Sequence, residues 1–228
     1  MKDFAKYCEK DRRGPKYTQP SERKYDSNEE AQYALWCDEA VEWGLLDEWE
    51  YQPPSWLLTP KATVMAEKQL KTKVKMIEKT LYQSHSYTCD MRLVLSELGL
   101  RAFSGVFPTT YLADVDWYLF GRRKTIMVDV KGGHQSYDGG RSFSINQKLM
   151  YWFYKIVIEK VVPWKSQRDR KGKPKKTNKD GTMKANKCFF MDTFCPDTLR
   201  YQKNGELSAM GRNCPTVDEF INNIKETK

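Results

Sequence analysis

The sequence predicts an α/β fold in which a mixed sheet, containing an antiparallel hairpin, is flanked by helices. The main observation is a period-two alternation over 113–120 and again over 125–131, on either side of a short turn that begins at Gly121. Two capping-box patterns, at residues 27–30 and 144–147, predict helices before and after this hairpin. The order of helix, strands, helix and strand favours a sheet covered by helices.

The composition indicates one globular domain with an anionic partner. The chain has 228 residues and a net charge of +9, which makes DNA the first candidate partner. No apolar run is long enough to cross a membrane, and the first residues lack the apolar core of a secretory signal. Six cysteines without metal-like spacing are typical of free thiols. We therefore expect a protein of the cytoplasm that is neither secreted nor bound to a membrane.

The predicted elements follow one another along a single domain. Residues 1–26 are polar and basic and are expected to form a loosely docked N-terminal arm, and 27–228 form the domain. Before the hairpin we expect a helix from Ser27 to Gly44, an extended segment over 49–58 broken by Pro53-Pro54, an undecided segment over 60–79 and a strand within 81–95. After the hairpin we expect a loop over 132–140, a helix from Ser144 to about Val161, a Lys-rich insertion over 165–187, a buried strand over 188–194, a turn at Asn204-Gly205 and a final helix from Thr216 to about Lys225.

The hairpin gathers charged side chains on one face. If its turn is centred on Arg122-Arg123, Asp116 lies opposite Asp129 and Asp114 lies opposite Lys131. Cross-strand neighbours have Cβ atoms roughly 5 Å apart, so these carboxylates could share a divalent cation. Asp90 is a further carboxylate. It lies within the preceding predicted strand, where a carboxylate without a partner is disfavoured.

These residues resemble the PD-(D/E)xK nuclease superfamily, which has the restriction-endonuclease-like fold. That family carries an Asp on one strand and a D/E-x-K on the next, which here is Asp129-Val130-Lys131. The pair Gln147 and Tyr151 resembles the Q-x-x-x-Y helix of the RecB-like branch, and Glu30 matches an acidic residue that many members place on the first helix. The approach to Asp90 is also similar to phage-type junction-resolving endonucleases. The resemblance covers roughly residues 27–195.

The resemblance implies a divalent-metal-dependent DNA endonuclease that uses Mg²⁺ or Mn²⁺. Lys131 would assist attack on the phosphodiester bond, and Asp90, Asp114 and Asp116 compete for the position of the motif Asp. The expected metal ligands and catalytic acids are Asp116, Asp129 and Glu30, with Asp90 as a further metal ligand. The expected DNA contacts are Gln147, Tyr151, Arg122, Arg123, Lys124, Lys173, Lys175 and Lys176.

Three alternatives stay open at this point. Glu30 is fully accounted for by the capping box, and Gln147 could likewise be only a cap. The enzyme could be an exonuclease or a structure-specific resolvase of the same fold, or the chain could bind nucleic acid without catalysis. Double-strand cutting would favour a homodimer, whereas nicking would not. The role of such a nuclease in a phage, a mobile element, recombination or defence is not decided by the residues.

Overall fold

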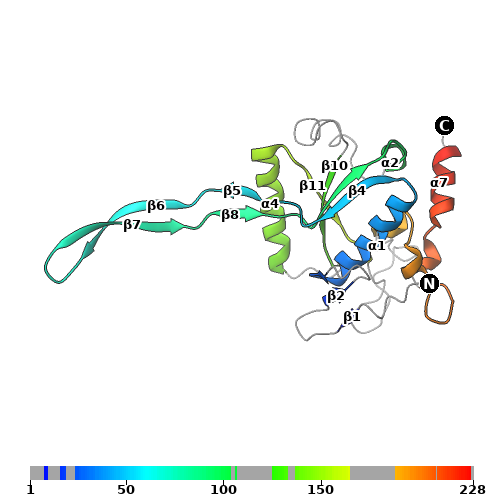
Figure 1. Ribbon diagram of the computed structural model, residues 1–228, viewed down its shortest axis with the longest axis horizontal. Helices are drawn as coiled ribbons and strands as arrows, with labels where there is room; N and C mark the ends of the chain where they lie inside the picture. Colours follow the sequence, from blue (N-terminus) through cyan, green and yellow to red (C-terminus); the bar gives the residue numbers. More distant parts are fainter. Residues whose placement is uncertain are drawn as a thin grey trace, which may run out of the picture.

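The centre of the protein is a mixed four-stranded sheet with strand order β11-β10-β9-β4 (Figure 1). The computed structural model describes residues 8–9, 16–18, 24–103, 106, 125–132, 137–164, 188–208 and 210–226. The sheet strands are β4 (Leu46–Tyr51), β9 (Met91–Leu95), β10 (Thr125–Val130) and β11 (Ile158–Val161). β10 is antiparallel to β9 and parallel to β11, and β9 is antiparallel to β4. The predicted mixed α/β architecture is therefore confirmed.

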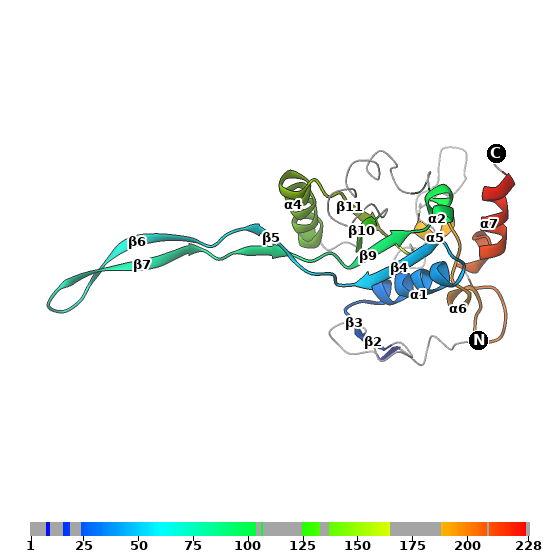
Figure 2. The same cartoon turned by 45° about the horizontal axis from the view of Figure 1, so that its top comes forward.

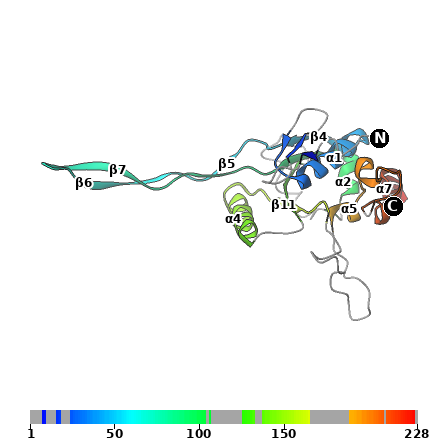
Figure 3. The same ribbon diagram turned by 90° about the horizontal axis from the view of Figure 1, so that it is seen from below.

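Helices cover both faces of this sheet. They are α1 (Asn28–Glu42), α2 (Glu97–Ala102), α4 (Tyr137–Tyr154), α5 (Phe189–Asp192), α6 (Asp197–Arg200) and α7 (Val217–Glu226), with a 3₁₀ turn at Gly211–Asn213. Ile126, Val128 and Val130 of β10 point into a core shared with α1, α5 and α7, whereas Met127 points into a second core shared with α4. Figure 3 shows α1 and α4 on opposite sides of the sheet.

A long antiparallel hairpin grows out of the sheet between β4 and β9. The two chains stay paired through β5 (Trp56–Thr59) with β8 (His85–Tyr87), and then through β6 (Ala62–Gln69) with β7 (Val74–Tyr82). The extended segment predicted over 49–58 is confirmed, and Pro53-Pro54 separates β4 from β5 as expected. The undecided segment over 60–79 is part of this hairpin, which extends far beyond the body of the protein (Figure 2).

The predicted hairpin between 113–120 and β10 is wrong. The strand antiparallel to β10 is β9, with Val128 opposite Met91, and the other edge of β10 is bonded to β11. All six residues of β10 are buried, as expected for a central strand. Residues 113–120 themselves lie outside the described residues. Alternation predicted the strand over 125–131 correctly, but it carries no information about which segment pairs with it.

Three further boundaries differ from the sequence prediction. α4 begins at Tyr137, inside the predicted loop, and ends at Tyr154 because Lys155 adopts a left-handed φ of 59°. The predicted strand over 188–194 contains helix α5, in which the consecutive Phe189 and Phe190 are both buried. A short apolar run does not distinguish a strand from a buried helical turn.

The predictions for α1 and α7 are confirmed in detail. The Glu30 amide donates to Ser27 Oγ at 3.2 Å, which caps α1, and the Glu219 amide donates to Thr216 Oγ1 at 3.2 Å, which caps α7. The predicted turn at Asn204-Gly205 is closed by a bridge between Tyr201 and Leu207.

The described parts of the N-terminal arm form a small sheet. Its strands are β1 (Cys8–Glu9), β2 (Lys16–Thr18) and β3 (Lys24–Tyr25), and Tyr25 is buried in the main core. The Lys-rich insertion over 165–187 lies outside the described residues. The cysteines at 37, 89, 188, 195 and 214 are buried and free. Among the described helices, none is both long enough and apolar enough to cross a bilayer.

One buried carboxylate makes stability depend on pH. Glu39 of α1 accepts a hydrogen bond from the Asp197 amide at 2.6 Å, and burial raises the pKa of Glu39 to about 7 from 4.5. The folded state therefore holds this proton more tightly than the unfolded state, and stability falls as pH rises from about 4.5 to 7.

We predict that Glu39→Gln raises the melting temperature at about pH 8 and leaves it nearly unchanged at about pH 4, because the amide keeps the acceptor oxygen and removes the charge. Melting curves of wild type and variant at both pH values test this. Glu206→Gln, at an exposed carboxylate, is the control and should change neither value. An equal shift at both pH values would mean that Glu39 does not titrate in this range.

Candidate active site

Asp90 and Asp129 face each other where β9 begins and β10 ends. The register that places Met91 opposite Val128 continues by one residue to this pair. The Val130 amide donates to Asp90 Oδ2 at 2.6 Å, which fixes the Asp90 carboxylate against β10. Asp129 is only 3% exposed. The structure therefore brings together a buried carboxylate, Asp129, and a partly buried one, Asp90, which the sequence places 39 residues apart.

Lys131 completes this cluster. It lies two residues after Asp129, so strand alternation places both side chains on the same face. Its ammonium forms an ion pair with Asp129 Oδ1 and lies 3.8 Å from Asp90 Oδ2. It also lies 5.8 Å from the ring centre of Phe143 on α4. The Lys131 side chain is 30% exposed, so this cluster is in contact with solvent at Lys131.

The Asp129 carboxylate disfavours the ionisation of Asp90. Burial, the hydrogen bond to Asp129 and the Asp129 charge raise the pKa of Asp90 to about 9, although Lys131 acts in the opposite direction. A cation bound between neighbouring carboxylates removes much of such a penalty. This electrostatic penalty marks Asp90 and Asp129 as candidate ligands of a cation.

Tyr87 at the base of the long hairpin holds Asp129 in place. Its hydroxyl donates to Asp129 Oδ2 at 2.8 Å, and Tyr87 is buried at the end of β8. Burial and the Asp129 charge raise the pKa of Tyr87, so the phenol stays protonated and remains a donor. Asp129 thus has one oxygen bound by Tyr87 and the other paired with Lys131.

Glu30 lies near this cluster but serves the start of α1. Its Oε1 accepts from Ser27 Oγ at 2.8 Å, and its Oε2 accepts from the Tyr51 hydroxyl at 2.7 Å and from the Asp26 amide at 3.2 Å. Its charge contributes to raising the pKa of Asp90, so it lies within electrostatic reach of the pair. Both carboxylate oxygens are engaged, one in the cap of α1 that the sequence pattern already offered and the other mainly with Tyr51 of β4.

Glu29 is an acid that sequence reasoning missed. A Cβ atom at Gly132 would lie 3.0 Å from Glu29 Oε1, so the Glu29 carboxylate lies against the chain just after Lys131. Tyr51 and Tyr87 were missed as well. The signal that could have indicated Glu29 was the pair Glu29-Glu30 at the start of the predicted helix, because either side chain could point toward the sheet.

The expected DNA contacts on α4 have different environments. Gln147 donates from Nε2 to the Ile158 carbonyl at 2.6 Å, which ties α4 to β11. Tyr151 is 52% exposed, and the Lys155 ammonium lies 5.4 Å from its ring centre. Both residues line a surface hollow of about 650 Å³, together with Lys148, Trp152, Val157 and Glu159.

Several expected site residues cannot be placed against this cluster. Asp114 and Asp116, the rival candidates for the motif Asp, lie outside the described residues. So do the remaining expected DNA contacts, which are Arg122, Arg123, Lys124, Lys173, Lys175 and Lys176. Among the residues that the structure does describe, no three His, Cys, Asp or Glu side chains are grouped closely enough to hold a metal ion.

Comparisons with family models, curated proteins and solved structures found no match. The geometry of the Asp90, Asp129 and Lys131 cluster is therefore the basis for assigning a function.

The hydrogen bond from Tyr87 gives a stability prediction. Tyr87→Phe removes a buried donor to a carboxylate, which typically costs about 1.5–3 kcal/mol in the free energy of unfolding. Urea unfolding of wild type and variant measures this difference. Tyr82→Phe, at a tyrosine that is 73% exposed, is the matched control and should cost less than about 0.5 kcal/mol. Equal effects of the two substitutions would show that the bond to Asp129 contributes nothing.

Proposed function

We propose that this protein is a divalent-metal-dependent endonuclease that hydrolyses phosphodiester bonds in DNA. The observation that carries the proposal is the apposition of Asp90 and Asp129 across β9 and β10, with the Lys131 ammonium beside both. A buried and a partly buried acid with one lysine beside them are costly for stability and have an evident use in phosphodiester chemistry. The net charge of +9 suits a polyanionic substrate.

The order of elements supports the expected resemblance to PD-(D/E)xK nucleases with the restriction-endonuclease-like fold. The D-x-K segment lies at the end of a central strand, an acid comes directly before the neighbouring strand, and the helix with Gln147 and Tyr151 follows. Among the three candidates for the motif Asp, this favours Asp90, because it lies directly opposite Asp129. The assignment also agrees with the similarity to phage-type junction-resolving endonucleases.

The carboxylate pair fits Mg²⁺ or Mn²⁺. Mg²⁺ is usually held by one or two carboxylates and keeps several of its waters, so it needs no larger group of protein ligands. Asp90 and Asp129 would hold the ion, and Glu30 would act on it only through its charge, because both of its oxygens already accept hydrogen bonds from Ser27 and Tyr51. When bound, such an ion lowers the pKa of a water and polarises a phosphoryl oxygen.

The remaining residues of the cluster have separate roles. Lys131 offers an ammonium that can orient an attacking water or offset the charge that develops on the phosphate. Tyr87 holds the Asp129 carboxylate in one orientation from the base of the hairpin. Phe143 lies near the Lys131 ammonium and limits the space in which this side chain moves.

Cleavage of plasmid DNA tests this proposal. With Mg²⁺, wild-type protein should nick or cut the plasmid, and chelation of the metal should stop the reaction. Asp129→Asn, Asp90→Asn and Lys131→Ala should each lower the rate by about 100-fold or more, because the first two weaken the binding of the metal ion and the third removes the cation beside the reacting phosphate. Asp47→Asn, at an exposed position on β4, is the matched control and should cut like wild type.

Comparison of substrates separates the remaining alternatives. Activity on circular DNA indicates an endonuclease, activity on linear DNA alone indicates an exonuclease, and preference for branched DNA indicates a resolvase. If wild-type protein cuts none of these forms, or if Asp129→Asn cuts as fast as wild type, the proposal is wrong.

A further inference from the structure

The distal part of the long hairpin, β6 and β7, has two faces of different charge. We call these two strands and their turn, residues 62–82, the β-arm. In the register Glu67 lies opposite Met76, and Met65 lies opposite Glu78. The hydrogen bond from Thr63 Oγ1 to Glu78 at 2.7 Å lies on this same face. This acidic face carries two carboxylates and no lysine.

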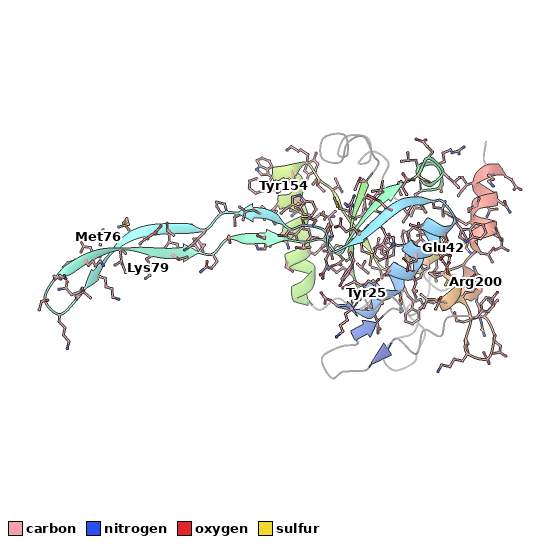
Figure 4. All side chains as sticks on the ribbon, in the orientation of Figure 1. Tyr25, Glu42, Met76, Lys79, Tyr154 and Arg200 are labelled. Carbon is pink, nitrogen blue, oxygen red and sulfur yellow. The ribbon has the colours of Figure 1, made fainter. Side chains whose placement is uncertain are left out.

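The opposite face is cationic. In the same register Lys68 lies opposite Lys75, and Lys79 lies opposite Val64. The ladder continues to the turn, where the Leu70 amide donates to the Lys73 carbonyl at 2.8 Å. This lysine face therefore carries Lys68, Lys73, Lys75 and Lys79 and no carboxylate. Figure 4 labels Lys79 on the lysine face and Met76 on the acidic face.

The lysine face is unfavourable in the protein alone. Like charges directly opposite each other on paired strands are destabilising, and Lys68 and Lys75 form such a pair. A two-stranded ribbon without a third strand is also only marginally stable in water. The β-arm also has little burial of its own to stabilise it, because it exposes large apolar side chains, among them Met65 at 62% and Met76 at 51%. A polyanionic partner on the lysine face would offset the repulsion between the lysines.

The base of the β-arm is held firmly against the body. The Tyr154 hydroxyl of α4 donates to the Leu57 carbonyl at 2.5 Å, and His85 Nε2 lies 2.8 Å from Asn146 Oδ1. Leu58 is buried in the core beside α4. The arm therefore leaves the body in a direction fixed by β5, β8 and α4, and Figures 1 and 2 both show it extending away from the sheet.

We propose that the β-arm binds double-stranded DNA through its lysine face, as a second contact outside the catalytic cluster. The proposal rests on the proposed function in taking DNA as the ligand. The eight residues of β6 span roughly 27 Å, which is the length of about eight base pairs at 3.4 Å each. A two-stranded ribbon also fits the major groove of DNA, with lysines facing phosphates on its walls.

Binding of a fluorescent DNA duplex by the full-length chain, in EDTA so that no cleavage occurs, tests this proposal. The arm variant carries Lys68→Gln, Lys75→Gln and Lys79→Gln. The control variant carries Lys203→Gln, Arg212→Gln and Lys225→Gln, at exposed positions outside the β-arm with the same change in net charge. Each phosphate contact contributes about 0.9 to the slope of log affinity against log salt, so the arm variant should lose about 2–3 from this slope.

The arm variant should bind at least tenfold more weakly than wild type at moderate salt, and the control variant should bind within about threefold of wild type. Equal effects of both variants would show that only net charge matters and would overturn the proposal. So would unchanged DNA binding accompanied by a change in oligomeric state on size-exclusion chromatography, which would assign the β-arm to a second copy of the chain.

The result separates this inference from the nuclease proposal. Binding that depends on the arm lysines, in a protein that never cuts DNA, would support the β-arm contact and refute the nuclease. Cleavage that depends on Asp129, with an arm variant that binds like wild type, would support the nuclease and refute the β-arm contact.

Discussion

The structure depends on two carboxylates, one buried and one partly buried, that face each other at the ends of neighbouring strands of the central sheet. Placing Asp90 beside the buried Asp129 raises the free energy of the ionised folded state, because the Asp129 charge and the loss of water both disfavour the Asp90 charge. The surrounding residues compensate in part. Lys131 lies beside both acids, Tyr87 donates to Asp129, and the Val130 amide donates to Asp90. Clusters of ionisable groups that are costly in this way are candidates for functional sites.

The topology explains how this pair arises. β9 and β10 are adjacent and antiparallel, so Asp90, directly before β9, lies beside Asp129, near the end of β10. The 39 residues between Tyr51 and Met91, which include the long hairpin, separate β4 from β9 in sequence and return the chain to the same edge. Tyr87, at the base of this hairpin, reaches the cluster directly. The β-arm and the candidate site are thus parts of one continuous structure, consistent with a shared ligand.

The sequence predicted local features well and long-range pairing poorly. The caps at Ser27 and Thr216 and the buried strand over 125–131 depend on neighbouring residues, and they are confirmed. The partner of that strand depends on a segment more than thirty residues away, and alternation gave no reason to prefer β9 over the nearer 113–120. Asp129 and Lys131 could therefore be predicted as neighbours on one strand face, whereas the choice of Asp90 as the acid opposite Asp129 required the strand order. Glu29 and Tyr87 were missed because their orientation is set by tertiary packing.

The central claim is that Asp90 and Asp129 together hold a divalent cation, and a crystal structure of the protein grown with Mn²⁺ tests it most directly. Anomalous diffraction identifies Mn²⁺ by its own scattering, so the position of the ion does not depend on how the protein atoms are placed. The account predicts a peak between the Asp90 and Asp129 carboxylates, with the Lys131 ammonium moved off Asp129, and no peak in crystals of Asp129→Asn. A well-ordered site without a peak, or a peak held by other residues, would contradict it.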